Sequence, residues 1–387
     1  LGEIEVVFGL WAAAFIGVFM LWDGPKAAVA YVDSVNFTEP LFVFVIMAIC
    51  STRPILEMAR TLIFSCARVF RRIFRTPAIQ TELFAILTLG PLAGSFITEP
   101  AAMTVTALIL FSMIRGMNAR VLYLMLGVLF VNVSIGGAMT PYAAPPILMV
   151  ASTWGWDFSY IMTHLGWKAM VVVAINSLLF VVISSTHLSG NFHTFDELES
   201  KGGDRGAAVP LWVTLWHLAF LVPVIIFAHH PAMFMGIFLF FLGVVTLTKH
   251  HQEKVRLKES LLVAFFLGGI VVFGPFQTWW LKPLLASMGD LALFVGASAL
   301  TAITDNAALT YLGSQVEGLS ETAKVALVAG ALAGGGLTVI ANAPNPAGYS
   351  ILQSRFPGKE INPLGLLLGA LLPTVVAMCC LWWLPSL

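Results

Sequence analysis

The chain carries the same polar pattern twice within apolar sequence. It reads ITEPAAMT at 97–104 and ITDNAALT at 303–310. A second related pair follows at one fixed offset, GGAMT at 136–140 and GGGLT at 334–338. Two matched motifs in the same order indicate an internal duplication, which constrains the fold more than any single segment does. We therefore expect two structurally related halves.

The sequence around these motifs is typical of an integral membrane protein. Of its 387 residues, 59% are apolar and 10% are charged, whereas a soluble domain carries about 25% charged residues. Several apolar runs exceed the roughly 18 residues that a helix needs to cross a bilayer. The formal net charge is zero, so no basic face is available for nucleic acid. We predict an all-α, multi-pass protein of a bacterial-type inner membrane, in contact with lipid.

Each half is predicted to contain a re-entrant helical hairpin. Residues 82–114 are apolar but interrupted by Gly90–Pro91 and by residues 98–100, which would leave each arm too short to span. Residues 291–315 form the second hairpin, with residues 304–306 at its tip. Irregular backbone at membrane depth is tolerated only where protein or a water-filled cavity surrounds it.

Each half is also predicted to contain a discontinuous membrane helix. The segments 121–153 and 323–353 are long enough to cross, but glycines and prolines break their middles. The first half then covers residues 1–187 and the second residues 211–387, joined by a polar, glycine-rich cytoplasmic linker at 188–210.

The two halves are expected to have inverted topology. Five crossings separate the two hairpins in this reading, so the hairpins open from opposite sides of the membrane. The loops predicted to be cytoplasmic hold most of the basic residues: Arg68, Arg71, Arg72, Arg75, Arg115, Arg120, Lys201, Arg205, Lys249, Lys254, Arg256, Lys258, Arg355 and Lys359. The outer loops hold Lys26, Lys168, Lys282 and Lys324. This asymmetry follows the positive-inside rule, and inverted repeats with a midplane site are typical of secondary transporters.

The candidate binding residues are the polar and glycine residues of the motifs. An ionisable side chain at membrane depth is a functional hypothesis by default, which places Glu99 and Asp305 first. A tip carboxylate can hold sodium or a proton, and the two compete for the same oxygens. The remaining candidates supply neutral oxygens or close backbone approach: Thr98, Thr104, Gly136, Gly137, Thr140, Thr304, Asn306, Thr310, Gly335, Gly336, Thr338, Asn342 and Asn345.

Structural alternatives remain open for several of these residues. In one alternative, Glu99 and Asp305 have no role beyond that of helix N-terminal residues that interact with the helix dipole. The threonine hydroxyls can bond to the carbonyl four residues earlier. Because Asn342 and Asn345 lie among prolines in the second half, we expect them near Asp305, with Glu99 facing the amide-free residues 141–146. The acids would then not be equivalent, and Asp305 would be the stronger sodium ligand.

At these residues the chain resembles the ion transporter superfamily, which includes NhaD-type sodium/proton antiporters, arsenite pumps and divalent anion symporters. The resemblance covers nearly the whole chain and is most specific at residues 304–306 and 335–345. Within the superfamily the chain is similar to the putative sodium/proton antiporters. The divalent anion symporters carry Ser-Asn-Thr at both hairpin tips, whereas this chain carries an acid at each tip. The resemblance implies a transporter without an organic cofactor, and a homodimer is common in the superfamily.

We therefore predict a secondary transporter rather than an enzyme, exchanging sodium for protons by alternating access, with Glu99, Asp305, Asn342 and Asn345 holding sodium. Lithium is an expected second cation. The alternative is a sodium- or proton-coupled carrier of a small anion, such as a dicarboxylate or arsenite, held by half-helix N-termini.

Overall fold

The computed structural model describes residues 4–74, 77–116, 118–188, 190–200, 209–251, 255 and 257–387. These residues are helical and form no strand, apart from an isolated bridge between Ile114 and Phe192. Six of the described helices are long and apolar enough to cross a membrane. The predicted all-α, multi-pass membrane fold is confirmed. Five of the predicted cytoplasmic basic residues lie outside the described residues: Arg75, Lys201, Arg205, Lys254 and Arg256.

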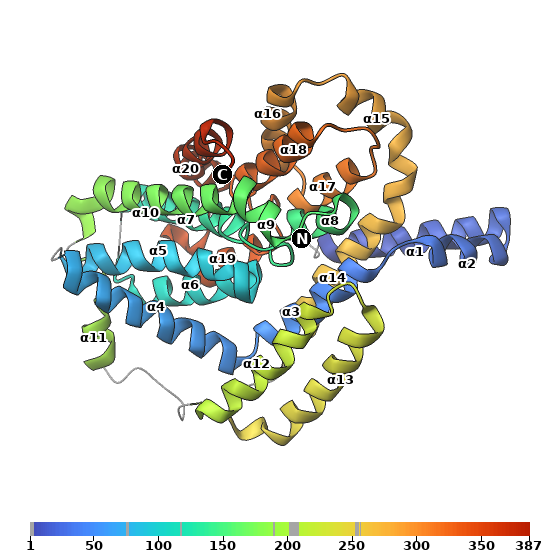
Figure 1. Ribbon diagram of the computed structural model, residues 1–387. Helices are drawn as coiled ribbons and strands as arrows, with labels where there is room; N and C mark the ends of the chain where they lie inside the picture. The colour runs from blue at the N-terminus through green and yellow to red at the C-terminus, as the bar shows by residue number, and fades with distance from the viewer. Residues whose placement is uncertain are drawn as a thin grey trace.

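Both predicted hairpins consist of two helices joined at the motif residues (Figure 1). The first is α5 (Ala78–Ile97) and α6 (Glu99–Met113), which pack against each other. The second is α16 (Asp290–Thr301) and α17 (Asn306–Ser314).

The expectation that each arm is too short to span is wrong for α5. This helix has 20 residues and continues through Pro91. A proline has no N–H to donate to the carbonyl four residues earlier, here that of Leu87. Asn132 Nδ2 donates to the Leu87 carbonyl at 2.9 Å instead. The helix therefore passes its proline without leaving that carbonyl unsatisfied.

Two pairs of helices occupy the segments predicted as broken helices. The first consists of α7 (Ala119–Gly136) and α8 (Pro145–Trp154), and the second of α18 (Glu321–Gly334) and α19 (Asn345–Leu352). Each second hairpin arm packs against the broken helix of the other half, α6 against α19 and α17 against α8. The two halves therefore build their centre together.

The remaining helices lie outside this centre, and α1 and α2 project to one side (Figure 1). The apolar run at 41–65 is divided between α3 and α4, because residues 51–52 separate them. Helix α14 packs against α1 and α3, and α12 packs against α13 and α3. Lys168 lies buried within α10 rather than in an outer loop. The bounds of the remaining helices are α1 (Ile4–Asp23), α2 (Pro25–Ser34), α3 (Thr38–Cys50), α4 (Arg53–Phe74), α9 (Phe158–Ile161), a π-helix (Met162–Gly166), α10 (Trp167–Leu188), α11 (Phe195–Ser200), α12 (Leu211–Ile226), α13 (Pro231–Leu247), α14 (Leu257–Phe273), α15 (Thr278–Ala286) and α20 (Pro363–Trp383).

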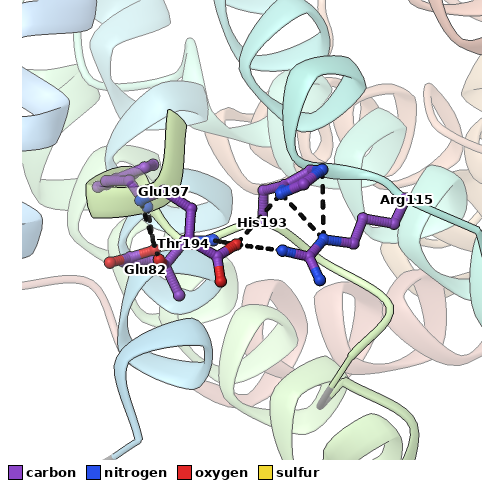
Figure 2. Close-up of polar contacts among 6 residues, drawn as sticks. Glu82, Arg115, His193, Thr194 and Glu197 are labelled. Atoms are coloured by element: carbon purple, nitrogen blue, oxygen red, sulfur yellow. Dashed lines mark hydrogen bonds and ion pairs between the residues drawn. The ribbon is translucent and has the colours of Figure 1, made fainter. Parts of the chain in front are cut away.

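The described part of the predicted linker, residues 190–200, lies against the open end of the first hairpin (Figure 2); residues 189 and 201–208 lie outside the described residues. Glu197 accepts hydrogen bonds from Arg115 at 2.5 Å and from His193 at 3.1 Å. Glu82, buried at the start of α5, accepts from the Phe195 backbone N–H at 3.0 Å. We call these residues the linker contact.

The two acids of the linker contact differ in exposure. The hydrogen bond from His193, together with Arg115, holds the pKa of the half-exposed Glu197 carboxyl below its usual value. A lowered pKa in the folded protein stabilises it above the unfolded pKa, and this contribution is lost as pH falls through the lowered value. Exposed pairs contribute little to stability. The side chain of Glu82 is 3% exposed, so its hydrogen bond is made in a drier environment.

We expect Glu82→Ala to lower the free energy of unfolding by about 1–3 kcal/mol, because it leaves the Phe195 N–H without its acceptor. Glu197→Ala should have a smaller effect. Thermal unfolding of the detergent-solubilised variants measures both. Equal losses in the two variants would contradict this reading of the contact.

Candidate functional site

Four helices begin at the motif residues and bring both halves to one place. They are α6, α8, α17 and α19. Asn306 N–H, in the second hairpin, donates to the Ala341 carbonyl in the second break at 3.1 Å. Asn342 in that break bonds in turn to Glu99 in the first hairpin. Because helix N-termini present unpaired N–H groups and a partial positive charge, this centre attracts negative charge.

Glu99 is the most buried acid of this centre. Its side chain is fully buried, and Asn342 Nδ2 donates to its Oε2 at 2.7 Å. Its other oxygen, Oε1, is buried without a hydrogen-bond partner. The described residues provide no basic side chain in an ion pair with it. A buried carboxylate oxygen without a partner is costly unless a proton or cation satisfies it.

The expectation that Glu99 faces an amide-free region is wrong, because Asn342 Nδ2 donates to it. Asp305 also lies beside this break, since the N–H of the next residue, Asn306, donates to the Ala341 carbonyl. The first hairpin packs against the second broken helix, so Glu99 meets the amide of the other half. Sequence gives the order of the segments but not which half faces which tip.

Asp305 is the N-cap of α17. Its Oδ1 accepts from the backbone N–H groups of Ala307 at 2.8 Å and Ala308 at 3.0 Å, as an N-cap carboxylate does. It is only partly buried, and it is close enough to act electrostatically on Glu99. At least one oxygen of Asp305 therefore acts as a helix cap, as in the structural alternative.

Thr98 holds the first tip in a strained conformation. Its φ of 73° and ψ of 151° fall in a region that is essentially restricted to glycine. Such a conformation costs on the order of 1–3 kcal/mol and persists only where the surroundings enforce it. The Thr98 hydroxyl is buried and has no hydrogen-bond partner. The strain thus occurs at the residue that precedes the buried acid.

The three asparagines leave oxygens unsatisfied. Asn345 Nδ2 donates to the carbonyls of Gly335 and Thr338, both at 2.8 Å, so its nitrogen is identified by two acceptors and its Oδ1 remains without a partner. Asn342 uses its nitrogen on Glu99 and also leaves Oδ1 unpartnered. Neither amide atom of the fully buried Asn306 has a partner. The centre therefore contains spare acceptor oxygens.

The motif glycines allow this close packing. A Cβ at Gly137 would lie 2.6 Å from Glu99 Oε1, and one at Gly335 would clash with Ser134 Oγ and lie 2.9 Å from Asn306 Nδ2. Gly136 approaches the Pro91 carbonyl, and Gly336 approaches the backbone of Val131. These positions have no space for a side chain.

The predicted threonines divide into two groups. Thr104, Thr304 and Thr310 bond to the carbonyl four residues earlier, at 2.8–3.1 Å, which is the structural alternative stated above. Thr140 and Thr338 instead donate to hairpin carbonyls, those of Ser95 at 2.7 Å and Ala302 at 2.8 Å. This second pair fixes each break to its own hairpin at matched positions of the two halves.

Sequence reasoning missed three buried polar residues. Ser95 Oγ donates to the Gly136 carbonyl, and Ser134 Oγ donates to the Leu332 carbonyl of the other half. Asn132 satisfies the carbonyl freed by Pro91. A serine or asparagine inside an apolar run is the signal that could have identified them, since each occupies a membrane helix without charged neighbours.

The arrangement is suited to a hard cation. One carboxylate, three amides and a free hydroxyl contribute unpartnered oxygens, and oxygen ligands are those that hard cations prefer. The described residues contain no group of three or more His, Cys, Asp or Glu side chains that could hold a transition metal.

Fold and site together define a multi-pass helical membrane transporter. The sequence profile of the putative Na+/H+ antiporter family matches residues 1–384, and the chain belongs to that family. A search of curated proteins found no match. Among solved structures the chain is similar to the Alcanivorax borkumensis YdaH transporter, whose crystal structure is described as revealing an unusual topology. The two share 13% sequence identity over 98% of this chain and 96% of that chain, with a TM-score of 0.50, which supports the fold alone.

We expect Gly137→Ala to remove any stabilisation of the protein by monovalent cations, because the added methyl group would displace the Glu99 carboxylate. Overpacking of this kind costs about 1–3 kcal/mol, so the basal melting temperature should also fall. Gly236→Ala in α13 is the matched control, since its Cβ would meet no atom within 4 Å. Cation-dependent thermal shifts of both variants test this. An unchanged shift in Gly137→Ala would mean that the pocket beside Glu99 holds no cation.

Proposed function

We propose that the protein exchanges sodium for protons across the membrane by alternating access, with Glu99 as the carboxylate that binds sodium and protons in turn. The observation that carries this proposal is the buried Glu99 carboxyl, which has one oxygen engaged by Asn342 and the other unpartnered. Family membership supports sodium and protons as the substrates. A proton or a sodium ion satisfies the same oxygen, so binding of one excludes the other.

The unpartnered oxygens of Glu99, Asn342 and Asn345 support a cation over an anion. The donors of Asn342 and Asn345 are already used by Glu99 and by carbonyls of the second break. Their oxygens remain. Attraction between unit charges about 4 Å apart is worth roughly 4 kcal/mol at an effective dielectric constant near 20. Repulsion of an anion by an ionised Glu99 would be of similar size.

An anion carrier is the competing function, because four helix N-termini meet at the site. Two of these N-termini already carry an acid of their own, Glu99 in the first turn of α6 and Asp305 at the cap of α17. An arriving anion would therefore meet negative charge at two of the four positive ends. This favours the cation.

The structure gives reason to reverse the ranking of the two acids. One oxygen of Asp305 caps α17, which holds the second tip in place. Glu99 receives no backbone hydrogen bond among the described residues, and its protonation is free to change with the bound ion. We therefore assign exchange to Glu99, and to Asp305 the shape and charge of the tip.

We expect Glu99→Gln to abolish sodium/proton exchange, because glutamine can neither release a proton nor balance the charge of sodium. Asp305→Asn should retain exchange at a rate reduced by about ten-fold, since asparagine is also a good N-cap. Proteoliposomes with a pH-sensitive dye measure both. Undiminished exchange in Glu99→Gln, at normal protein yield, would rule out its assigned role.

Sodium or lithium should stabilise the detergent-solubilised protein against heat, and more strongly at high than at low pH, because protons compete for the same oxygens. Dicarboxylates and arsenite should have little effect. A dicarboxylate that raises the melting temperature while sodium does not would replace the antiporter proposal with the anion carrier.

The inverted arrangement of the two halves predicts the sidedness of their loops. Cysteines at Gly116 and Ser287, in a variant without the four native cysteines, should react from the cytoplasmic and outer sides respectively. Membrane-impermeant maleimide on oriented vesicles is the measurement. The further predicted cytoplasmic positions Met117 and Gly203 lie outside the described residues. Labelling of Gly116→Cys and Ser287→Cys from one side would refute inverted repeats.

A further inference from the structure

Glu39 is a buried carboxylate outside the site at the hairpin tips. It lies in the first turn of α3 and is 8% exposed. Ser152 Oγ, near the end of α8, donates to its Oε1 at 2.8 Å. No basic side chain among the described residues forms an ion pair with Glu39. An acid buried in this way requires a compensating positive charge or a proton.

Glu39 does not act as the cap of its own helix. The N-cap position of α3 is Phe37, which makes no side-chain capping bond, and the Thr38 N–H is satisfied by Asn36 Oδ1 at 3.0 Å. The Glu39 side chain instead reaches across to α8. An exposed acid would interact equally well with the helix dipole, so the dipole does not account for the burial of Glu39.

A small cleft lies between α3, α8 and the first hairpin tip, and neither Glu39 nor Ser152 is among the residues that line it. It is lined by Val43 and Ile46 from α3, by Pro145 and Leu148 from α8, and by Thr98 and Pro100 from the tip. Residues four and seven apart share one face of a helix. Glu39 is therefore one turn beyond Val43, and Ser152 is one turn beyond Leu148, at the end of the cleft away from the tip.

One polar group lies at the inner end of the cleft and another lies one helical turn outside it, and mostly apolar residues line the space between them. At the inner end, the Thr98 hydroxyl is buried without a partner, next in sequence to Glu99. Outside the cleft is the acid with its single serine partner. The predicted topology places the start of α3 and the end of α8 on the outer side of the membrane.

We propose that Glu39 and Ser152 form a second binding site, for a monovalent cation of the sodium or lithium class, one helical turn outside the cleft that is lined by Thr98. This inference rests on the proposed exchange. The carboxylate replaces part of the hydration of the cation before the cation enters the cleft. Glu39 then determines the apparent affinity for sodium on the outer side, whereas Glu99 determines whether exchange occurs.

The test is the sodium dependence of proton flux in right-side-out and inside-out membrane vesicles. Glu39→Gln should raise the KM for outer sodium by about five-fold, with the maximal rate and the inner KM changed by less than about two-fold. Ser152→Ala should raise the outer KM by about two-fold, because the carboxylate remains. Asp290→Asn is the matched control, an acid in the first turn of α16 on the same predicted side, and should change neither KM.

An unchanged outer KM in Glu39→Gln would overturn the proposal, as would equal rises at the two faces. If Glu39→Gln does not reach the membrane, Glu39→Asp and Ser152→Ala are measured together. Both should raise the outer KM by about two-fold, and no change in either would count against the site. Wild-type-like exchange in Glu99→Gln would refute the proposed function alone, because the outer KM of Glu39→Gln remains measurable in that case.

Discussion

The structure depends on how it satisfies backbone groups freed inside the membrane. Each hairpin and each broken helix leaves carbonyls without a helical N–H, and lipid offers no hydrogen bond to replace it. Polar side chains in the motifs and beside them supply the missing donors. Ser95 donates to the Gly136 carbonyl, and Asn345 donates to those of Gly335 and Thr338. The first role of these side chains is therefore to satisfy the backbone of the fold.

The same hydrogen bonds determine which polar atoms remain available at the site. An amide side chain has a donor end and an acceptor end, and the freed carbonyls use only donors. Once Asn345 has given its nitrogen to the second break, and Asn342 has given its nitrogen to Glu99, the oxygens of both remain. These acceptor oxygens offset the positive ends of the helices that meet at the centre. The proposed affinity for a cation therefore rests on the way in which the freed carbonyls are satisfied.

Much of this architecture could be predicted from sequence, and the limits have physical causes. The interruptions at 98, 137–144, 302–305 and 335–344 occur at or beside prolines, glycines and polar residues, which do not favour a continuous apolar helix. Pro91 was expected to interrupt its helix, but α5 continues through it. The donor that compensates for the proline is Asn132, which lies 41 positions further on in another helix, so the local sequence does not reveal it. The pairing of Glu99 with Asn342 spans both halves, and a duplication does not reveal whether its copies pair with themselves or with each other. Local sequence predicts where a helix breaks, whereas tertiary packing determines which side chains satisfy the freed backbone groups.

The duplication kept an acid at each tip but placed the two in different surroundings. Two ionised carboxylates close together in a buried site repel each other, so an equal pair could not both remain charged without cations or protons. Here the second acid, Asp305, accepts hydrogen bonds from two backbone N–H groups at a helix N-terminus. The first, Glu99, has a single amide and one unpartnered oxygen. In the proposed exchange, a positive species on Glu99, whether sodium or a proton, relieves the repulsion between the two acids. The two acids occupy matching positions of the sequence but differ in their partners, and the proposed assignment of their roles rests on that difference.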